Sequence, residues 1–567
     1  MAADDNAKEL HKRETALFSK KATLDSFRQE CALQFYPESA DFVGEQQWGA
    51  EFAEHLFDVS AVLNCRDLGN AFSSMLRPRG QPWFRAATGD EELDKRPDVA
   101  RVLDHITTTM RGVMYRPQTQ FVEAGKEADR DIATFGNYVL SRDLNYDESG
   151  LLYQCFHLRD CAWARNADRI EDTMFRREKM TARQIGQKFR DAPLHTDISK
   201  AIEKEPDCEF PICQVLMPSE DYEYYYEKPK LRTDFVSVYY DSAHQMLISE
   251  RPSHEFRYIV GRWQNIRGSP YAVSPAAIAA LGEARGLQIM KRVILEAGEV
   301  AVDPSIKLVA GAIKGEVNLY AGGQTWVDKA YDERLGPAIE TIKRDTNTGL
   351  GIDLLMLSAA TLKNAWYLTK LTLPQQGAKT AFETAQLVEE FVRANVPLFE
   401  PMETNNARLL ESTFVLLLRR GAFGDMRDWP RELANQEIEW RFSNPLQDNI
   451  ERNKVNQATT VLGLIAGTQK IDPNAPGARR FDLDELVADA GRGSGAPATW
   501  LRDEEVVAQE IAAQQAANEN AMMAGSVVAG LNAAGQAADV VNAGADAAAK
   551  LQQIMPPVDG TGAYGPI

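Results

Sequence analysis

The chain has 567 residues, enough for roughly three or four folding units, and its composition of 44% hydrophobic and 26% charged residues is ordinary for a soluble protein. No apolar run reaches the length of a membrane span and the N-terminal segment lacks an apolar signal, so we expect no membrane contact and synthesis in the cytoplasm. The net charge of −19 argues against a protein that grips nucleic acid over a broad surface, but not against one that DNA slides past, because like charges repel.

The N-terminal part is predicted to be helical. Apolar residues recur at helical spacing over residues 7–36 until Pro37, and further helices are predicted over 61–76, 99–114 and 118–140. The other face of the first helix carries basic side chains: Lys8, Lys12, Arg13, Lys20 and Lys21. We expect this face to be solvated, with a subunit contact as the alternative.

The next part of the chain is predicted to be rich in strands. Strands are expected over 150–165 and over 208–263, with a short helix near 181–189 between them. Within the second block, the sequence DYEYYYEKP alternates aromatic and acidic residues. Aromatic residues stack on bases, but acidic ones repel nucleic acid, so we expect a strand edge or an intersubunit contact here.

The segment GRWQNIRGSPYAVSPAAIAALGEARGLQIMKR combines a strand end, a turn and the start of a helix. The turn is Gly-Ser-Pro, and Ser274 is placed to cap a helix whose first residue is Pro275. We expect this helix to continue to Ala297. A short β-rich module is predicted over 300–327, followed by a second helix over 332–348 with acidic residues at its start and basic residues at its end.

Helices dominate the predicted C-terminal part. An apolar helical stretch (LLMLSAATLKNAWYL) and a loop (TKLTLPQQGAK) precede a long amphipathic helix, which we expect to break at Pro397 and to continue to about Arg420. Residues 445–470 are also predicted to be helical. The segment after Asp503 is rich in Ala, Gln and Asn, and forms either a helix that packs against its own copies or a mobile tail.

No motif of an active site is recognisable. The phosphate-binding loop, the HExxH zinc motif, the GxSxG nucleophile motif and the Rossmann fingerprint are all missing from the sequence. The six cysteines show no metal spacing and are expected to be reduced, structural thiols. The seven histidines lie far apart, and each is expected to be structural unless the fold assembles a site from them. FDLDEL, with Asp482, Asp484 and Glu485, is expected to be a helix start rather than a metal site. We therefore predict no enzyme, no cofactor and no metal.

Three lysines lie in or beside the apolar helix and the loop that follows it: Lys363, Lys370 and Lys379. Taken singly, each is expected to be a solvated side chain. In a ring of identical subunits, however, each would be repeated around the axis and would form a belt of positive charge in an acidic protein.

The order of these elements resembles the portal, or head-to-tail connector, proteins of short-tailed (podovirus-type) bacteriophages. The resemblance covers roughly residues 10–480. It rests mainly on the segment 261–292 and on KTAFETAQLVEEFVRANVPLFEPMETNNARLLESTFVLLLRRGAF, with support from AFSSMLRPRGQPWF and FGNYVL. The stretch YAVS at 271–274 departs mildly from the Tyr-Gly-Arg type of sequence that the family often has.

The resemblance implies an α+β fold, in which an elongated portal-type subunit of wing, stem, clip and crown assembles into a ring with a central channel. The subunit is expected to be mainly helical, with a β-rich wing and clip. The implied parts, in chain order, are the wing (1–262), the first stem helix (263–298), the clip (299–328), the second stem helix (329–352), the tunnel-loop region (353–379), the wing return and crown (380–480), and an Ala-rich, partly disordered crown or barrel extension (481–567).

The implied function is a dodecameric ring at one capsid vertex, through which double-stranded DNA is packaged and ejected. The implied partners are further copies of the chain, double-stranded DNA, the terminase large subunit, major capsid and scaffolding proteins, tail adaptor or nozzle proteins, and internal core or ejection proteins. The implied location is the virion, with the host cytoplasm during assembly. The alternatives are another virion structural protein, such as an internal core, ejection or tail adaptor protein, and an enzyme with an unrecognised site.

The resemblance also points to residues for two sites. Candidates for the DNA channel are Lys343, Arg344, Lys363, Lys370 and Lys379. Candidates for docking at the clip are Asp303, Lys307, Lys314, Glu316 and Trp326.

Overall fold

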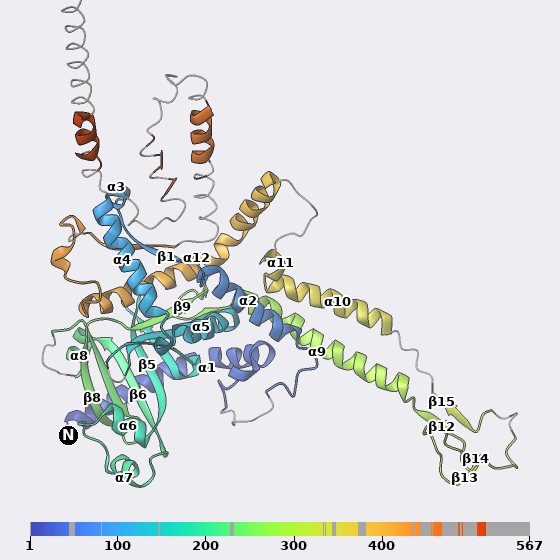
Figure 1. Cartoon of the computed structure of the whole chain (residues 1–567). Helices are drawn as coiled ribbons and strands as arrows, with labels where there is room; N and C mark the ends of the chain where they lie inside the picture. The colour runs from blue at the N-terminus through green and yellow to red at the C-terminus, as the bar shows by residue number, and fades with distance from the viewer. Residues whose placement is uncertain are drawn as a thin grey trace, which may run out of the picture.

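A body of helices and sheets carries a long two-helix arm with a small β module at its far end (Figure 1). The computed structural model describes residues 2–44, 52–80, 82–145, 148–226, 232–332, 334, 336–342, 348–371, 381–433 and 436–442, and helical pieces between 455 and 517. The side chains of residues 381–396 are not among those described. Within these limits, no helix combines the length and the apolar character that crossing a membrane requires.

A five-stranded antiparallel sheet forms one end of the body. Its order is β4 (Cys161–Arg165), β5 (Glu171–Thr181), β6 (Glu209–Pro218), β7 (Phe235–Asp241) and β8 (Met246–Ser253). Because side chains alternate along a strand, Val238 and Tyr240 face one side and Tyr239 the other. The first side is covered by α1 (Ala2–Phe35) and α8 (Ser219–Tyr226), and the second by α6 (Ala182–Lys188) and α7 (Thr196–Lys204).

The main hydrophobic core lies around a three-stranded sheet of order β3 (Leu151–Phe156), β2 (Asn137–Leu144) and β9 (Tyr258–Arg262). The helices packed there are α2 (Ser60–Leu76), α4 (Pro97–Met114), α5 (Phe121–Phe135) and α12 (Ala381–Arg419). A further pair, β1 (Phe84–Thr88) with β16 (Ile438–Phe442), joins segments that are far apart in the sequence. Shorter elements are α3 (Glu91–Lys95), β10 (Gln264–Asn265), β11 (Ala272–Val273) and the 3-10 turns Pro37–Ser39, Pro117–Thr119, Leu158–Asp160 and Met426–Asp428.

The basic face of α1 is not uniformly solvated. Lys8 and Lys12 are exposed, as predicted, but Lys21 is fully buried, and its Nζ donates to the carbonyl oxygens of Leu158 and Arg159 at 2.7 and 2.8 Å. Burial lowers the pKa of Lys21 to about 8. The prediction of a solvated side chain is therefore wrong for Lys21, because the helix turns this part of its polar face toward the body.

The predicted helix over 118–140 is too long. The structure ends α5 at Phe135, where Gly136 adopts the left-handed conformation (φ 75°) and its N–H donates to the Ile132 carbonyl at 2.9 Å. The apolar residues that follow belong to β2, which pairs with both β3 and β9. Strand β5, the longest of the large sheet, also lies where we predicted none.

The segment DYEYYYEKP starts as a helix, not as a strand edge. Tyr222 and Tyr226 are spaced one helical turn apart and both are buried against the large sheet, whereas Tyr224 and Tyr225 are exposed. This spacing fits α8, because a helix places residues i and i+4 on one face, whereas a strand would bury Tyr224 together with Tyr222 and Tyr226. An intersubunit contact of the exposed tyrosines remains a prediction.

Helix α12 is continuous through Pro397 and Pro401, which contradicts the predicted break. Proline removes a backbone hydrogen bond from a helix, at a cost of about 3 kcal/mol. Phe399, Met402, Leu409 and Leu410 are buried in the main core, and this packing stabilises the helix across both prolines.

Most cysteines are structural thiols, as predicted. All six are free; Cys31, Cys65, Cys161 and Cys213 are buried, Cys155 is half-buried and Cys208 is exposed. Burial raises the pKa of Cys65 to about 12, so its thiol stays protonated.

Candidate assembly and docking surfaces

The arm begins at Ser274, which lies in the main core. The Ser274 hydroxyl accepts from the Ala277 N–H at 3.1 Å and donates to the Ala133 carbonyl at 2.6 Å. The predicted cap is thus confirmed, and it also ties the helix start to α5. The helix that follows, α9 (Pro275–Val302), is longer than predicted, and Asp303 is its C-terminal cap.

A buried polar contact holds the turn in front of the arm. The Asn137 side chain accepts from the Ala272 N–H at 2.8 Å and donates to the Gly261 carbonyl at 2.9 Å. Arg28 of α1 donates to the same Asn137 oxygen at 3.1 Å and forms an ion pair with Asp25. The direction in which the arm leaves the body is therefore set by contacts from α1, β2 and β9.

The first turns of α9 are clamped by the body. Gln288 accepts from the N–H groups of Phe57 and Asp58 at 2.7 and 2.8 Å, and donates to the Asp58 carbonyl. Arg285 pairs with Glu30 of α1. The far half of α9 extends away from the body (Figure 1).

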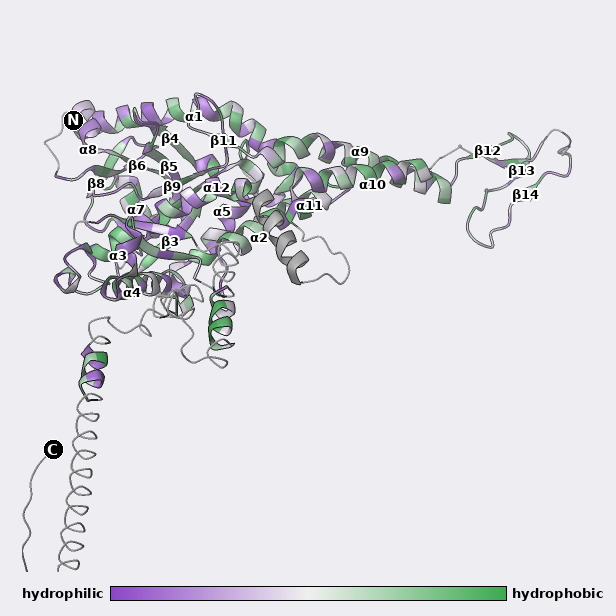
Figure 2. Ribbon diagram, turned by 90° about the horizontal axis from the view of Figure 1, so that it is seen from above, coloured by the Kyte–Doolittle hydropathy of each residue, from purple (hydrophilic) through white to green (hydrophobic). Residues whose placement is uncertain are grey.

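The second helix of the arm is α10 (Thr348–Ala365), which runs back along α9 (Figure 2). The two helices pack closely: a Cβ added at Gly351 would lie 3.3 Å from Ile294. The predicted helix over 332–348 is wrong. Gly336 with φ 115° and the following Pro337 stop a helix there, and Ile339–Thr341 forms strand β15 instead.

Both arm helices expose apolar side chains. Leu350, Leu354 and Leu357 of α10 follow the i, i+4, i+7 spacing and so lie on one face, and Leu357 is 65% exposed. On α9, Ile289 and Val293 repeat one turn apart, and Ile289 is also 65% exposed. A row of large exposed apolar side chains makes this face a candidate contact surface for another protein.

The far end of the arm is a small β module. Strand β12 (Ile306–Leu308) pairs with β15 (Ile339–Thr341), and β13 (Ile313–Lys314) pairs with β14 (Trp326–Val327). Among the residues of the module that the structure describes, Ala312 is buried and most others are exposed or half-buried. Trp326, Tyr320 and Leu319 are exposed, Trp326 by 70%. The module therefore presents aromatic and apolar side chains at the point farthest from the body.

The family model described as "Bacteriophage head to tail connecting protein" matches residues 7–501. The chain belongs to this family. This is a family of structural proteins, and membership is consistent with a connector subunit in the virion. None of the curated proteins compared matches the connector chain.

The solved structures that resemble the connector chain include two of gene transfer agent particles. One is described as "Virion of native gene transfer agent (GTA) particle", with 10% identity and a TM-score of 0.34. The other is "Neck of empty GTA particle computed with C6 symmetry", with 11% identity and a TM-score of 0.34. Each match covers 74% of the connector chain and 91% of the other chain. At these TM-scores, neither likeness adds to the assignment.

The structure places two of the five DNA-channel candidates. Lys363 is exposed in the last turn of α10, and Lys370 is exposed in α11 (Leu368–Leu371), 5.7 Å from the ring centroid of Tyr367. Both therefore lie at the base of the arm, near the body. Lys343, Arg344 and Lys379 lie outside the described residues, as do Asp482, Asp484 and Glu485.

The five docking candidates all lie in the module or at its entrance. Asp303 ends α9, and Glu316 and Trp326 are exposed. Lys307 pairs with Glu340 at 3.5 Å across β12 and β15, and Lys314 pairs with Asp328 at 3.2 Å. Both lysines are thus mainly exposed, and each forms one ion pair within the module. The exposed Tyr320 and Leu319 were missed, although their place in a Gly-rich, apolar segment was visible in the sequence.

Proposed function

We propose that this connector is a portal protein of the podovirus type, whose copies form a closed ring at one capsid vertex. About twelve copies, the number that the resemblance implies, join by heterologous contacts. The observation that carries the proposal is the pair of arm helices with exposed apolar rows, ending in an exposed β module, in a chain of this family.

In this proposal α9 and α10 are the stem, with α10 in place of the second stem helix that we had predicted over 329–352. The apolar rows on the stem become buried between neighbouring subunits. Each large side chain moved out of water stabilises the contact by about 1.5–3 kcal/mol when fully buried. Repeated around a ring, such contacts favour closure over an open chain.

The module over 303–342 is the clip, which docks first the large subunit of the terminase and later the tail adaptor or nozzle proteins. The body is the wing and meets the major capsid, scaffolding and internal core or ejection proteins. Double-stranded DNA passes through the channel during packaging and ejection, and the chain itself needs no catalytic step. An acidic wall keeps the duplex from sticking, and Lys363 and Lys370 supply weak phosphate contacts.

Sedimentation of purified protein tests the assembly surface. We expect the wild-type chain to sediment as a large oligomer, and Ile289→Asp with Leu357→Asp to sediment mainly as monomers, because each aspartate places a charge in the proposed contact. Ile170→Asp is the matched control, since Ile170 is 50% exposed on the body. If the stem variant assembles like the control, the stem contact is refuted, and an adaptor or internal core protein becomes the better interpretation.

A further inference from the structure

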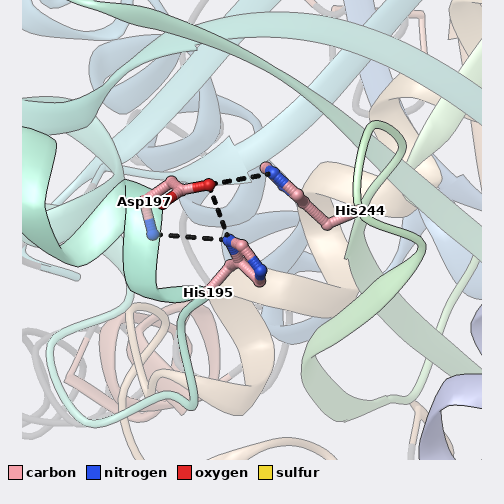
Figure 3. A group of neighbouring side chains, drawn as sticks. All are labelled: His195, Asp197 and His244. Atoms are coloured by element: carbon pink, nitrogen blue, oxygen red, sulfur yellow. Dashed lines mark hydrogen bonds and ion pairs between the residues drawn. The ribbon is translucent and has the colours of Figure 1, made fainter.

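Two histidines and an aspartate meet on the body (Figure 3), near α7 and far from the arm (Figure 1). His195 precedes α7, Asp197 lies in its first turn, and His244 lies in the turn between β7 and β8. One possible ligand atom from each lies within 4.8 Å of the others. From this geometry we propose that His195, Asp197 and His244 bind a first-row divalent cation of the zinc class.

The separations of the donor atoms suit zinc. His195 Nδ1 lies 3.5 Å and His244 Nε2 lies 3.7 Å from the same Asp197 oxygen. Ligand bonds of about 2.0–2.1 Å in a tetrahedral site place neighbouring donors roughly 3.3–3.4 Å apart. A small inward movement of the side chains therefore brings these two pairs of atoms to the spacing of zinc ligands. Two imidazoles and one carboxylate are a ligand set that zinc accepts, with water in the fourth position.

A buried carboxylate orients one of the ligands. The Asp241 side chain, which is 1% exposed, binds His244 Nδ1 and also accepts from the Ala243 N–H at 2.8 Å. With Nδ1 held as the donor, Nε2 presents its lone pair to the cluster. Carboxylates in this position fix the tautomer and raise the basicity of a metal-binding histidine.

The two imidazoles now stack, with ring centroids 3.8 Å apart and planes inclined by 15°. His195 Nδ1 accepts from the Asp197 N–H at 3.3 Å, so this nitrogen is unprotonated, and a bound cation would take the place of that hydrogen bond. Binding requires both rings to turn about χ2, which is a broad torsion for histidine. The side chains are about one-third exposed, so solvent leaves room for this turn.

The cation would join α7 to the large sheet, which otherwise contact each other through a small hydrophobic cluster. α6 and α7 pack on the sheet through a cluster that includes Ile185, Phe189 and Ile198. The proposed site lies beside this cluster and links the start of α7 to the β7–β8 turn. Its role is thus a structural clasp on the outer sheet, and it does not depend on the proposed ring.

Titration of zinc chloride into the full-length, chelator-treated protein tests the site by calorimetry. We expect one zinc ion per chain, with at least tenfold weaker binding for His195→Gln and for His244→Gln. His105→Gln is the matched control, because His105 is exposed on α4, and should bind like wild type. Equal affinity in all four proteins, or no binding to wild type, would overturn the proposal.

Two measurements on the wild-type chain test the site even if a variant fails to fold. Cobalt(II) should give the spectrum of a nitrogen and oxygen site, whereas a thiolate charge-transfer band would assign the metal to cysteines and refute the clasp. Zinc should also slow hydrogen exchange in residues 196–204 and 241–246. Unchanged exchange there, with zinc bound, would place the ion elsewhere.

Discussion

A side chain at Gly136 would collide with the backbone of Val273: an added Cβ would lie 1.9 Å from the Val273 carbonyl carbon. Gly136 also has φ 75°, a conformation that favours glycine. The end of α5 and the residue before the capped start of α9 therefore touch, and this contact requires a residue without a Cβ.

Gly136→Ala is expected to destabilise the chain by more than about 2 kcal/mol, because both the backbone collision and the left-handed conformation oppose it. Urea unfolding followed by circular dichroism measures the change. Gly112→Ala in the exposed part of α4, where nothing lies within 4 Å of the added Cβ, is the control and should be neutral or slightly stabilising. Equal stability of the two variants would contradict the close contact.

Asp131 predicts a pH dependence of stability. It is buried in α5, and burial raises its pKa to about 7. Between the unfolded value near 4 and this pKa, the folded state binds the extra proton, so stability falls as pH rises through this window. The Asp41 carboxylate raises the pKa of the neighbouring His157 above its ordinary value, and this contribution is also lost as pH rises.

Asp131→Asn is expected to remove the part of the pH dependence of stability that is due to Asp131. Relative to wild type, the variant should gain up to about 4 kcal/mol between pH 4 and pH 8, the equivalent of a pKa shift of about three units. Unfolding in urea at several pH values measures it, with the exposed Asp104→Asn as control. A variant whose slope equals that of wild type would show that Asp131 is not the titrating group.

Removal of the β module should separate docking from assembly. We expect a short Gly-Ser linker in place of residues 305–341 to leave rings intact and to abolish binding of the packaging motor. The whole module must be removed. A shorter deletion that ends at Thr325 would remove β12 and β13 and leave their partners, β15 and β14, unpaired.

Trp326→Ala with Tyr320→Ala gives a milder form of this test. We expect at least tenfold weaker motor binding in a pull-down titration, since exposed aromatic residues dominate contact energies, and normal ring assembly. Ile170→Ala on the body is the control. Loss of rings on removal of the module would mean that it is not peripheral, and normal docking of the double variant would exclude its aromatic residues as the contact.

Reversal of charge at the base of the arm tests the lysine belt. Lys363→Glu with Lys370→Glu should slow packaging, or weaken retention of DNA, several-fold without changing ring assembly, because phosphate contacts become repulsive. Lys8→Glu with Lys12→Glu, exposed on α1, changes the net charge equally and should have little effect. DNA handling equal to that of the control would refute the belt.

The sequence was sufficient to predict those elements that are determined by neighbouring residues. Ser274 and Pro275 marked the start of α9, and a β module was correctly predicted after this helix, although it also includes β15, where a helix had been predicted. Other elements depend on distant partners. Tyr138 and Val139 continue an apolar run that fits a helix equally well, and only pairing with β3 and β9 makes it a strand. Pro397 remains helical because residues near it in sequence are buried by the body.

The candidate sites divide in the same way. The docking candidates of the module were named from the resemblance, and the exposed Leu319 and Tyr320 were missed although they lie in a Gly-rich segment. At 332–348 the overlooked signal was Gly336-Pro337, which outweighs the charge pattern of a helix. His195, Asp197 and His244 come from two separate segments, so no spacing rule reveals them. Sheet pairing between β7 and β8 creates the turn that carries His244 to α7.

Electron microscopy of the purified full-length chain tests the central claim most directly. The account predicts rings of about twelve subunits with a central hole wide enough for a DNA duplex, and with paired stem helices around the hole. Monomers, or particles filled at the centre, would contradict it.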